Sequence, residues 1–199
     1  MSIHVRQYES RDKPEWDRFV AASKNATFLF FRDYMDYHAD RFIDRSLMFF
    51  NEDKPVAVMP CNHRDGTLSS HDGLTFGGLI TGPAMRTQLL MNVFDIMIRH
   101  SRSQGYRSIY YKAIPHIYHS LPAGEDLYAL FVHGAKLVRR DVSATVSPAT
   151  GVAFSKGRKW MLGRGRKSGL EVRQSDDFRT FMAIEEAHLK SKYGIRPVH

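Results

Sequence analysis

The stretch Leu68-Ser-Ser-His-Asp-Gly-Leu-Thr-Phe-Gly-Gly-Leu-Ile-Thr-Gly-Pro83 stands directly before a segment of periodic apolar residues that runs to Gln104. Its residue types predict a strand, a glycine-containing loop and then a helix. Glycines let backbone N–H groups come close to a ligand, and the N-terminus of a helix favours an anion. The stretch therefore raises the question whether its loop holds a phosphate group.

The helix of this stretch is predicted over residues 85–104, because Leu89, Val93 and Met97 recur at four-residue spacing and Gly105 follows as a C-terminal cap. Other helices are predicted over 13–24, 32–39, 125–136, 156–168 and 177–192. Strands are predicted over 3–8, 46–51, 56–63, 74–81, 107–113 and 170–174, with a strand pair or one bent strand over 137–146. The order predicts a mixed α/β domain, a linker at 147–155, and the helix–strand–helix opening of a second unit.

Composition narrows the class of protein. The chain has 199 residues, of which 43% are hydrophobic and 25% charged, so a packed core is expected. Cys61 is the single cysteine, which excludes an intrachain disulfide and a CxxC metal site, and no His/Asp/Glu set has ligand spacing on one element. We expect no metal. The N-terminus lacks a signal-peptide core and no apolar run approaches ~18 residues, so a reducing, cytoplasmic location is expected.

Positive charge is concentrated in the last quarter of the chain. Residues 151–199 hold 11 Lys/Arg against 5 Asp/Glu, within a total net charge of +8. Basic clusters attract phosphates, nucleic acid or acidic surfaces, although a solvated helix face is the alternative. The candidates for phosphate or RNA contact are Lys156, Arg158, Lys159, Arg164, Arg166 and Lys167.

Four blocks of sequence, residues 27–38, 70–79, 111–119 and 125–131, together resemble the FemAB-like branch of the GNAT acyltransferase superfamily. The basic stretch 157–172 looks like the helix and strand that open the second GNAT repeat of such proteins. The resemblance implies a GNAT-like domain over 1–148 and an incomplete second repeat over 149–199. Family members usually carry two full repeats, so activity is expected where the second repeat is supplied.

The resemblance also implies a reaction. Members often belong to polysaccharide or cell-envelope biosynthesis, so we expect transfer of an acyl group to an amine of a sugar or envelope precursor. Acyl-CoA is the expected donor, and aminoacyl-tRNA is the alternative that the basic segment 156–167 suggests. GNAT-type transfer needs no covalent enzyme intermediate, because a positioned amine attacks the thioester once a base or water takes its proton.

The loop between the predicted strand and helix departs from the coenzyme-binding signature of GNAT enzymes, Arg/Gln-x-x-Gly-x-Gly/Ala. Here the loop is Thr81-Gly-Pro-Ala-Met-Arg86, with one glycine, and Pro83 removes a backbone donor. A pyrophosphate cradle needs several convergent N–H groups. We therefore expect this repeat to be a poor acyl-CoA site that chiefly builds the acceptor side.

Polar side chains gather after the predicted strand 107–113. Strand ends in open α/β sheets face ligands, so this cluster is a candidate for acceptor binding, with a histidine as base. The alternative is a loop whose histidines make ordinary hydrogen bonds. The cluster consists of Lys112, His116, Tyr118 and His119.

His71 is a third candidate base, although Asp72 beside it is better explained by a turn with Gly73, because adjacent residues rarely face each other. Arg32, Tyr37 and His38 lie on a short aromatic helix, where Arg32 would clamp a phosphate or carboxylate of the substrate. Glu125 and Asp126 begin a helix, where acidic residues are favoured for structural reasons.

Two further hypotheses remain open at this point. The chain is either an acyltransferase or a non-catalytic GNAT-like module that binds a phosphorylated sugar or RNA. Self-association into a homodimer would complete the second repeat if strands of a neighbour covered it.

Overall fold

Strands with apolar residues on both faces form the middle of the first sheet. In the computed structural model, which describes residues 3–37, 39–147, 149, 151 and 153–197, β2 lies between β1 and β3, both antiparallel to it. Phe49 of β2 lies opposite Val5 and Ala57. The strand order is β1-β2-β3-β6. The strands are β1 (Ile3–Gln7), β2 (Leu47–Asn51), β3 (Lys54–Met59) and β6 (Ile80–Thr81).

A second sheet of three strands diverges from the first. It consists of β4 (Asn62–Arg64), β5 (Thr67–Ser69) and β7 (Ser108–Tyr110), with β5 antiparallel to β4 and parallel to β7. The predicted strand 56–63 is thus divided between the sheets, and Pro60, which has no N–H to donate, lies at the break. The mixed α/β class with a largely antiparallel sheet is confirmed.

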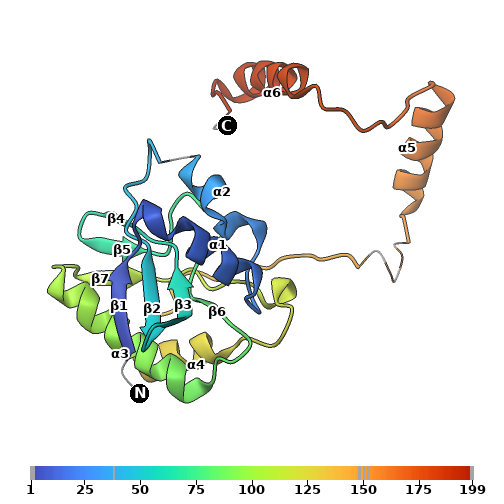
Figure 1. Cartoon of the computed structure of the whole chain (residues 1–199). Coiled ribbons are helices and arrows are strands. Elements are labelled where there is room, and N and C mark those ends of the chain that lie inside the picture. Colours follow the sequence, from blue (N-terminus) through green and yellow to red (C-terminus); the bar gives the residue numbers. More distant parts are fainter. Residues whose placement is uncertain (1–2, 38, 148, 150, 152, 198–199) are drawn as a thin grey trace. The chain divides into compact units, whose positions relative to one another are not determined.

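Helices cover the two faces of the four-stranded sheet (Figure 1). On one face, Trp16 and Val20 of α1 (Lys13–Ala21) pack with Met48, Val58 and Ile80. The short helix α2 (Arg32–Asp36) contributes to the same core. The opposite core consists of Phe49, Ala57 and Met59 under α3 (Thr87–Ser103) and α4 (Glu125–Val132).

The helix predicted over 85–104 is confirmed as α3. Its buried residues Leu90, Val93, Phe94 and Met97 recur at helical spacing on one side. The chain leaves the helix through Gly105, whose φ of +80° suits glycine. The helices predicted over 13–24, 32–39 and 125–136 are also present, although each ends earlier.

Two predicted strands are absent, and the strand predicted over 74–81 is shortened to its last two residues. Residues 74–79 form a loop, and only Ile80–Thr81 pair with β3. In the described parts of 137–146 and 170–174 there is no strand, because no neighbouring strand satisfies their backbone groups.

Contacts divide the chain into Met1–Arg139 and Arg140–His199. The second unit contains α5 (Lys156–Lys167) and α6 (Phe178–Tyr193), both predicted from the sequence. No side chain that the structure describes in this unit is buried. The predicted domain boundary at 148 stays a prediction. Across the described residues, no helix is both long and apolar enough to cross a bilayer.

Candidate functional site

The N-terminus of α3 lies directly after the short strand β6. No side chain caps its first turn, so its N–H groups remain available at the positive end of the helix dipole. The guanidinium of Arg86 donates to the carbonyls of Pro83 (3.2 Å) and Met85 (3.0 Å) and thus stays beside this turn. The position suits an anion, although Pro83 supplies no donor to it.

The glycines of residues 70–79 have another explanation than a phosphate cradle. A Cβ on Gly77 would lie 2.0 Å from the carbonyl oxygen of Ser70, where the loop crosses itself. Gly78, at φ +83°, lies against the ring of Tyr111. The glycines therefore allow close approach between parts of the protein itself.

The loop 70–79 is tied to the chain that continues from β7. The N–H of Lys112 donates to Ser70 Oγ (2.7 Å), and the N–H of Gly77 donates to the carbonyl of Lys112 (2.9 Å). These bonds replace the regular strand pairing that the sequence predicts for 74–79. The loop is thereby held against the segment that follows β7.

Tyr111 and Asp126 connect this loop to α4. The hydroxyl of Tyr111 accepts the N–H of Leu79 (2.8 Å) and donates to Asp126 Oδ2 (2.9 Å). Burial raises the pKa of Tyr111 well above its usual value, so the hydroxyl keeps its proton. Burial also raises the pKa of Asp126. The neighbouring Glu125 accepts from Lys24 Nζ (2.6 Å), so both acidic residues at this helix start have internal partners.

His71 is buried in an unusual conformation. Only 4% of it is exposed, its φ is +60°, and Nδ1 has no hydrogen-bond partner among the described residues. Its ring lies 5.2 Å from that of Phe42, and burial lowers its pKa to about 4. A left-handed conformation in a non-glycine residue costs free energy and is concentrated at functional sites.

Asp72 does not orient His71. Its N–H donates to Asn62 Oδ1 (2.8 Å), and its carboxylate accepts from Asn62 Nδ2 (3.3 Å). The N–H of Leu74 donates to the carbonyl of His71 (3.1 Å) and closes a turn. The turn predicted at Asp72-Gly73 is confirmed.

Lys112 lies in the same neighbourhood. Its Nζ donates to the carbonyl of Leu74 (2.5 Å), and burial lowers its pKa. Its charge reaches His71 and contributes to the lowered pKa there. A lowered pKa means that this lysine releases its proton more readily than an exposed lysine does.

An open groove of about 520 Å³ runs beside β5 and β7. Its lining includes Ser69, Asp72, Tyr110 and Lys136, so both signs of charge are present. Because Asp72 also belongs to the turn that carries His71, the groove ends beside the loop 70–79. A small ligand with several polar groups would fit here.

Arg32 is placed differently from the predicted ligand clamp. It is 2% exposed, its guanidinium contacts Asp44, Asp36 (3.0 Å) and Ser46 Oγ (3.2 Å), and it lies 3.7 Å from the centre of the Tyr8 ring. These partners leave the guanidinium no solvent-facing side for a bidentate contact with a ligand. We therefore assign Arg32 to the folded core. Tyr37 is 68% exposed on the chain after α2, and His38 lies outside the described residues.

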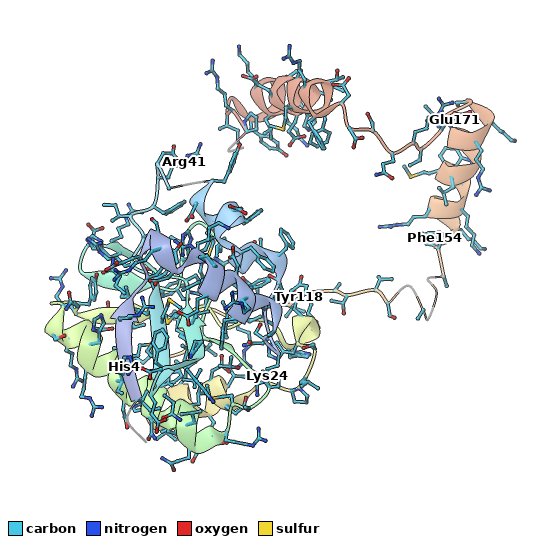
Figure 2. The ribbon with its side chains drawn as sticks, viewed as in Figure 1. His4, Lys24, Arg41, Tyr118, Phe154 and Glu171 are labelled. Atoms are coloured by element: carbon cyan, nitrogen blue, oxygen red, sulfur yellow. The ribbon has the colours of Figure 1, made fainter. Side chains whose placement is uncertain are left out.

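Of the two histidines after Lys112, His116 begins the 3₁₀ turn η3 (His116–Tyr118) and His119 directly follows it. The N–H of Ser120 donates to the carbonyl of Lys24 (2.8 Å) and holds this loop. His116 is exposed, and His119 Nε2 lies 3.2 Å from the carbonyl of Ile114. Lys24 and Tyr118 are labelled in Figure 2. Tyr118 stacks on Phe76 at 5.0 Å, so of this turn it is the side chain that contacts the loop 70–79.

Sequence reasoning did not single out Arg86 or Tyr111, and it explained Asp126 only by its place at a helix start. In the sequence, Arg86 is simply the last residue of the loop 81–86 that differs from the coenzyme-binding signature, and Tyr111 is one residue of the predicted strand 107–113. Their importance depends on contacts between segments far apart in the chain. In the described residues no group of three or more His, Cys, Asp or Glu could hold a metal ion.

The predicted phosphate or RNA contacts all lie on α5. This helix contains no acidic residue, and its basic side chains are all exposed. Phe154 and Glu171 lie near its two ends, and side chains project from it on all sides (Figure 2). The guanidinium of Arg164 lies 4.9 Å from the centre of the Trp160 ring.

No protein-family model matches the chain, and no curated protein matches it. Among solved structures, it is similar to a transcriptional regulator from Bacillus halodurans C-125, with 12% identity, 73% of this chain and 100% of the other covered, and a TM-score of 0.45. It is also similar to the aminoglycoside N-acetyltransferase AAC(6')-Iy in complex with a CoA bisubstrate analogue. Here the identity is 10%, the match covers 74% of this chain and 99% of the other, and the TM-score is 0.46. A third similar structure is a GNAT family acetyltransferase from Staphylococcus aureus, with 9% identity, 73% of this chain and 100% of the other covered, and a TM-score of 0.43. No statement about activity or substrate follows from likeness at this level.

Proposed function

We propose that the chain is part of a FemAB-like GNAT acyltransferase that transfers an acyl group to an amine of a sugar or cell-envelope precursor. The observation that carries the proposal is the uncapped N-terminus of α3, which begins shortly after β6, with Arg86 beside it. The sequence blocks that resemble this branch support it.

The donor in this proposal is acyl-CoA. Its phosphates would bind at the first turn of α3, where backbone N–H groups and the Arg86 guanidinium offer donors. The absence of a donor at Pro83 and the bonded loop 70–79 make this a weak cradle, so we expect modest affinity from this chain by itself. Aminoacyl-tRNA is the alternative donor.

The acceptor would lie in the groove beside β5 and β7. Its amine nitrogen would form a bond to the acyl carbon while the carbon–sulfur bond breaks and the thiolate of CoA leaves. The amine must lose a proton in the process, and Lys112 or a water would take it. His71 is poorly suited to this role, because a group whose pKa is about 4 is a weak base at neutral pH.

Calorimetric titration of the purified chain with acetyl-CoA tests the donor site. We expect Arg86→Ala to weaken binding by about tenfold, since a charge-assisted hydrogen bond contributes about 1.5–3 kcal/mol. Arg99→Ala is the matched control, because Arg99 is an exposed arginine on the same helix, away from its N-terminus. Absence of heat at millimolar acetyl-CoA, or equal affinity of the two variants, would contradict the site.

The second candidate is a non-catalytic module that binds RNA or a phosphorylated sugar. It is favoured by α5, where six basic residues and an exposed tryptophan occur without an acidic residue. Phosphate contacts give a steep dependence of log K on log salt concentration, and aromatic rings stack on bases. RNA binding with a flat salt dependence, or none at low salt, would eliminate the RNA form of this candidate.

A further inference from the structure

A cavity of about 380 Å³ lies at the other end of α3 from the proposed donor site. Two of its lining residues, His100 and Gln104, belong to the last turn of α3 and the residue after it. The helix has 17 residues, so about 25 Å of helix separates its two ends at a rise of 1.5 Å per residue. The cavity is therefore distinct from the donor loop.

The residues on the sheet face under α3 change from apolar to polar at this cavity. Leu47, Cys61 and Leu68 belong to the apolar core on this side. His63 lies opposite Leu68 in the pairing of β4 with β5, and Arg45 lines the same cavity as Leu47. Beyond the end of the core, the face that α3 covers thus becomes polar.

The polar side chains of the cavity are rich in hydrogen-bond donors and lack a carboxylate. They are Gln7, Arg45, His63, His100, Gln104 and Tyr106. The side chain of Arg45 has one weak contact, NH1 to the carbonyl of Asp44 at 3.4 Å, and no acidic partner within 4 Å among the described residues. An arginine without a carboxylate partner in a concave site is suited to bind an oxyanion.

His63 adds a second observation. Its Nδ1 is shielded from solvent and has no hydrogen-bond partner among the described residues, so no hydrogen bond holds its ring in one orientation. A buried polar atom without a partner costs free energy that a ligand can recover. The ring lies 5.9 Å from that of Tyr106, which forms the neighbouring wall.

The C-terminal carbonyls of α3 do not oppose an anion strongly, because the chain itself satisfies them. The N–H of Gly105 donates to Arg102, the N–H of Tyr106 donates to Ser101, and the hydroxyl of Ser103 donates to His100 (2.8 Å). This closure reduces the negative end of the helix dipole that faces the cavity.

From the cavity, the unpaired Arg45 and the donor-rich lining, we propose a binding site for a small molecule that carries a phosphate or carboxylate group. Arg45 is the anchor of the oxyanion, His63 and His100 contribute further donors, and Leu47 and Leu68 contact the apolar part of the ligand. This site does not depend on the acyltransferase proposal, since it uses none of the same residues.

Histidine-ring NMR signals during titration with inorganic phosphate test the site, with potassium chloride keeping ionic strength constant. The signals of His63 and His100 are assigned from His63→Gln and His100→Gln. We expect both to shift saturably, and Arg45→Gln to weaken binding by about tenfold or more. Arg41→Gln, an exposed arginine four residues earlier and outside the lining, is expected to bind as the unchanged chain does.

A parallel titration with acetate distinguishes a carboxylate ligand from a phosphate ligand, and saturable binding of either supports the site. Arg86→Ala must keep the same His63 and His100 shifts, which separates this site from the start of α3. Thermal unfolding of Arg45→Gln establishes that it is folded. Non-saturating shifts with both anions, or equal affinity of Arg45→Gln and the unchanged chain, would overturn the proposal.

Discussion

Trp16 and Trp160 lie in units that use an aromatic side chain in opposite ways. Trp16 is fully buried, its Nε1 donates to the carbonyl of Phe30 (2.8 Å), and its ring meets Tyr8 edge-on at 5.3 Å. Trp160 is 62% exposed, and its contact in the described part of α5 is the guanidinium of Arg164. The first unit therefore gains stability from its tryptophan, whereas the second presents its own to solvent.

The same contrast extends to the helices. The apolar residues of α3 lie in a core, whereas Phe178, Phe181 and Ile184 of α6 are each more than 60% exposed. Helical spacing of apolar residues is present in both cases. The difference shows that such spacing determines that a helix can bury one face, while the partner surface determines whether it does.

The largest expected effect is on the buried tryptophan. Trp16→Ala should lower the free energy of unfolding by about 3–5 kcal/mol, because it leaves a cavity and removes a hydrogen bond. Trp160→Ala should change it by less than about 0.5 kcal/mol. Urea unfolding followed by circular dichroism measures both. A comparable loss in the two variants would break the contrast between the units, and Trp16→Phe serves if the alanine variant does not fold.

A pH effect of intermediate size is expected from His71. Its pKa is about 4 when folded against 6.5 when exposed, so the unfolded chain binds more protons between these values. The neutral imidazole therefore stabilises the fold fully above pH 6.5, and this stabilisation is lost as the pH falls toward 4. At pH 4.5 the free energy of unfolding should be about 2.5 kcal/mol lower than at pH 7 because of this group.

Unfolding free energies of His71→Asn at the two pH values measure this effect. Asparagine tolerates the left-handed backbone of this position, so the variant should fold and should show a smaller loss on acidification. His188→Asn, in the exposed part of α6, should keep the full loss of the unchanged chain. An unchanged pH dependence in His71→Asn would contradict the burial of this imidazole.

A smaller decrease in the free energy of unfolding is expected when the connection between the loop 70–79 and α4 is removed. Tyr111→Phe leaves the N–H of Leu79 and the carboxyl of Asp126 without this partner, at a cost of about 1–3 kcal/mol. Amide exchange of Leu79 should accelerate. Tyr128→Phe is the control, since Tyr128 lies on α4 and is 53% exposed. An equal loss of unfolding free energy in both variants would show that the hydroxyl of Tyr111 contributes nothing specific.

The smallest effect is expected from removal of the second unit. A chain of residues 1–139 should unfold with the same urea midpoint as the full chain, because the described side chains of the second unit form no core. The amides of α5 should exchange quickly in the full chain, since three glycines within twelve residues weaken this helix. A lowered midpoint, or slow exchange in α5, would show that the units stabilise each other.

The sequence predicted the helices well, because each depends on local spacing and on end signals such as Gly105. It failed for residues 74–79, where the apolar residues suggested a strand. Their backbone bonds go to Lys112 and Tyr111, which follow 32 or more residues later and whose positions local patterns do not encode.

The candidate site could be predicted only in part. His71, Lys112 and Tyr118 were identified as residue types with suitable chemistry, and the fold brings all three to the loop 70–79. Arg32 has equally suitable chemistry, but it is enclosed by Asp44, Asp36 and Tyr8. Chemistry is a property of the residue, whereas access to a ligand is a property of its surroundings.

The sequence by itself determined the mixed α/β class, the helix after the glycine stretch and the basic character of α5, because these depend on composition and on spacing within one segment. The tertiary structure decided what the glycines do. Gly77 and Gly78 allow the chain to pass close to Ser70 and Tyr111, and these contacts arise only when distant segments pack together. The glycines of this stretch therefore do not form a phosphate site, and the first turn of α3 is the place where backbone donors remain available to a phosphate.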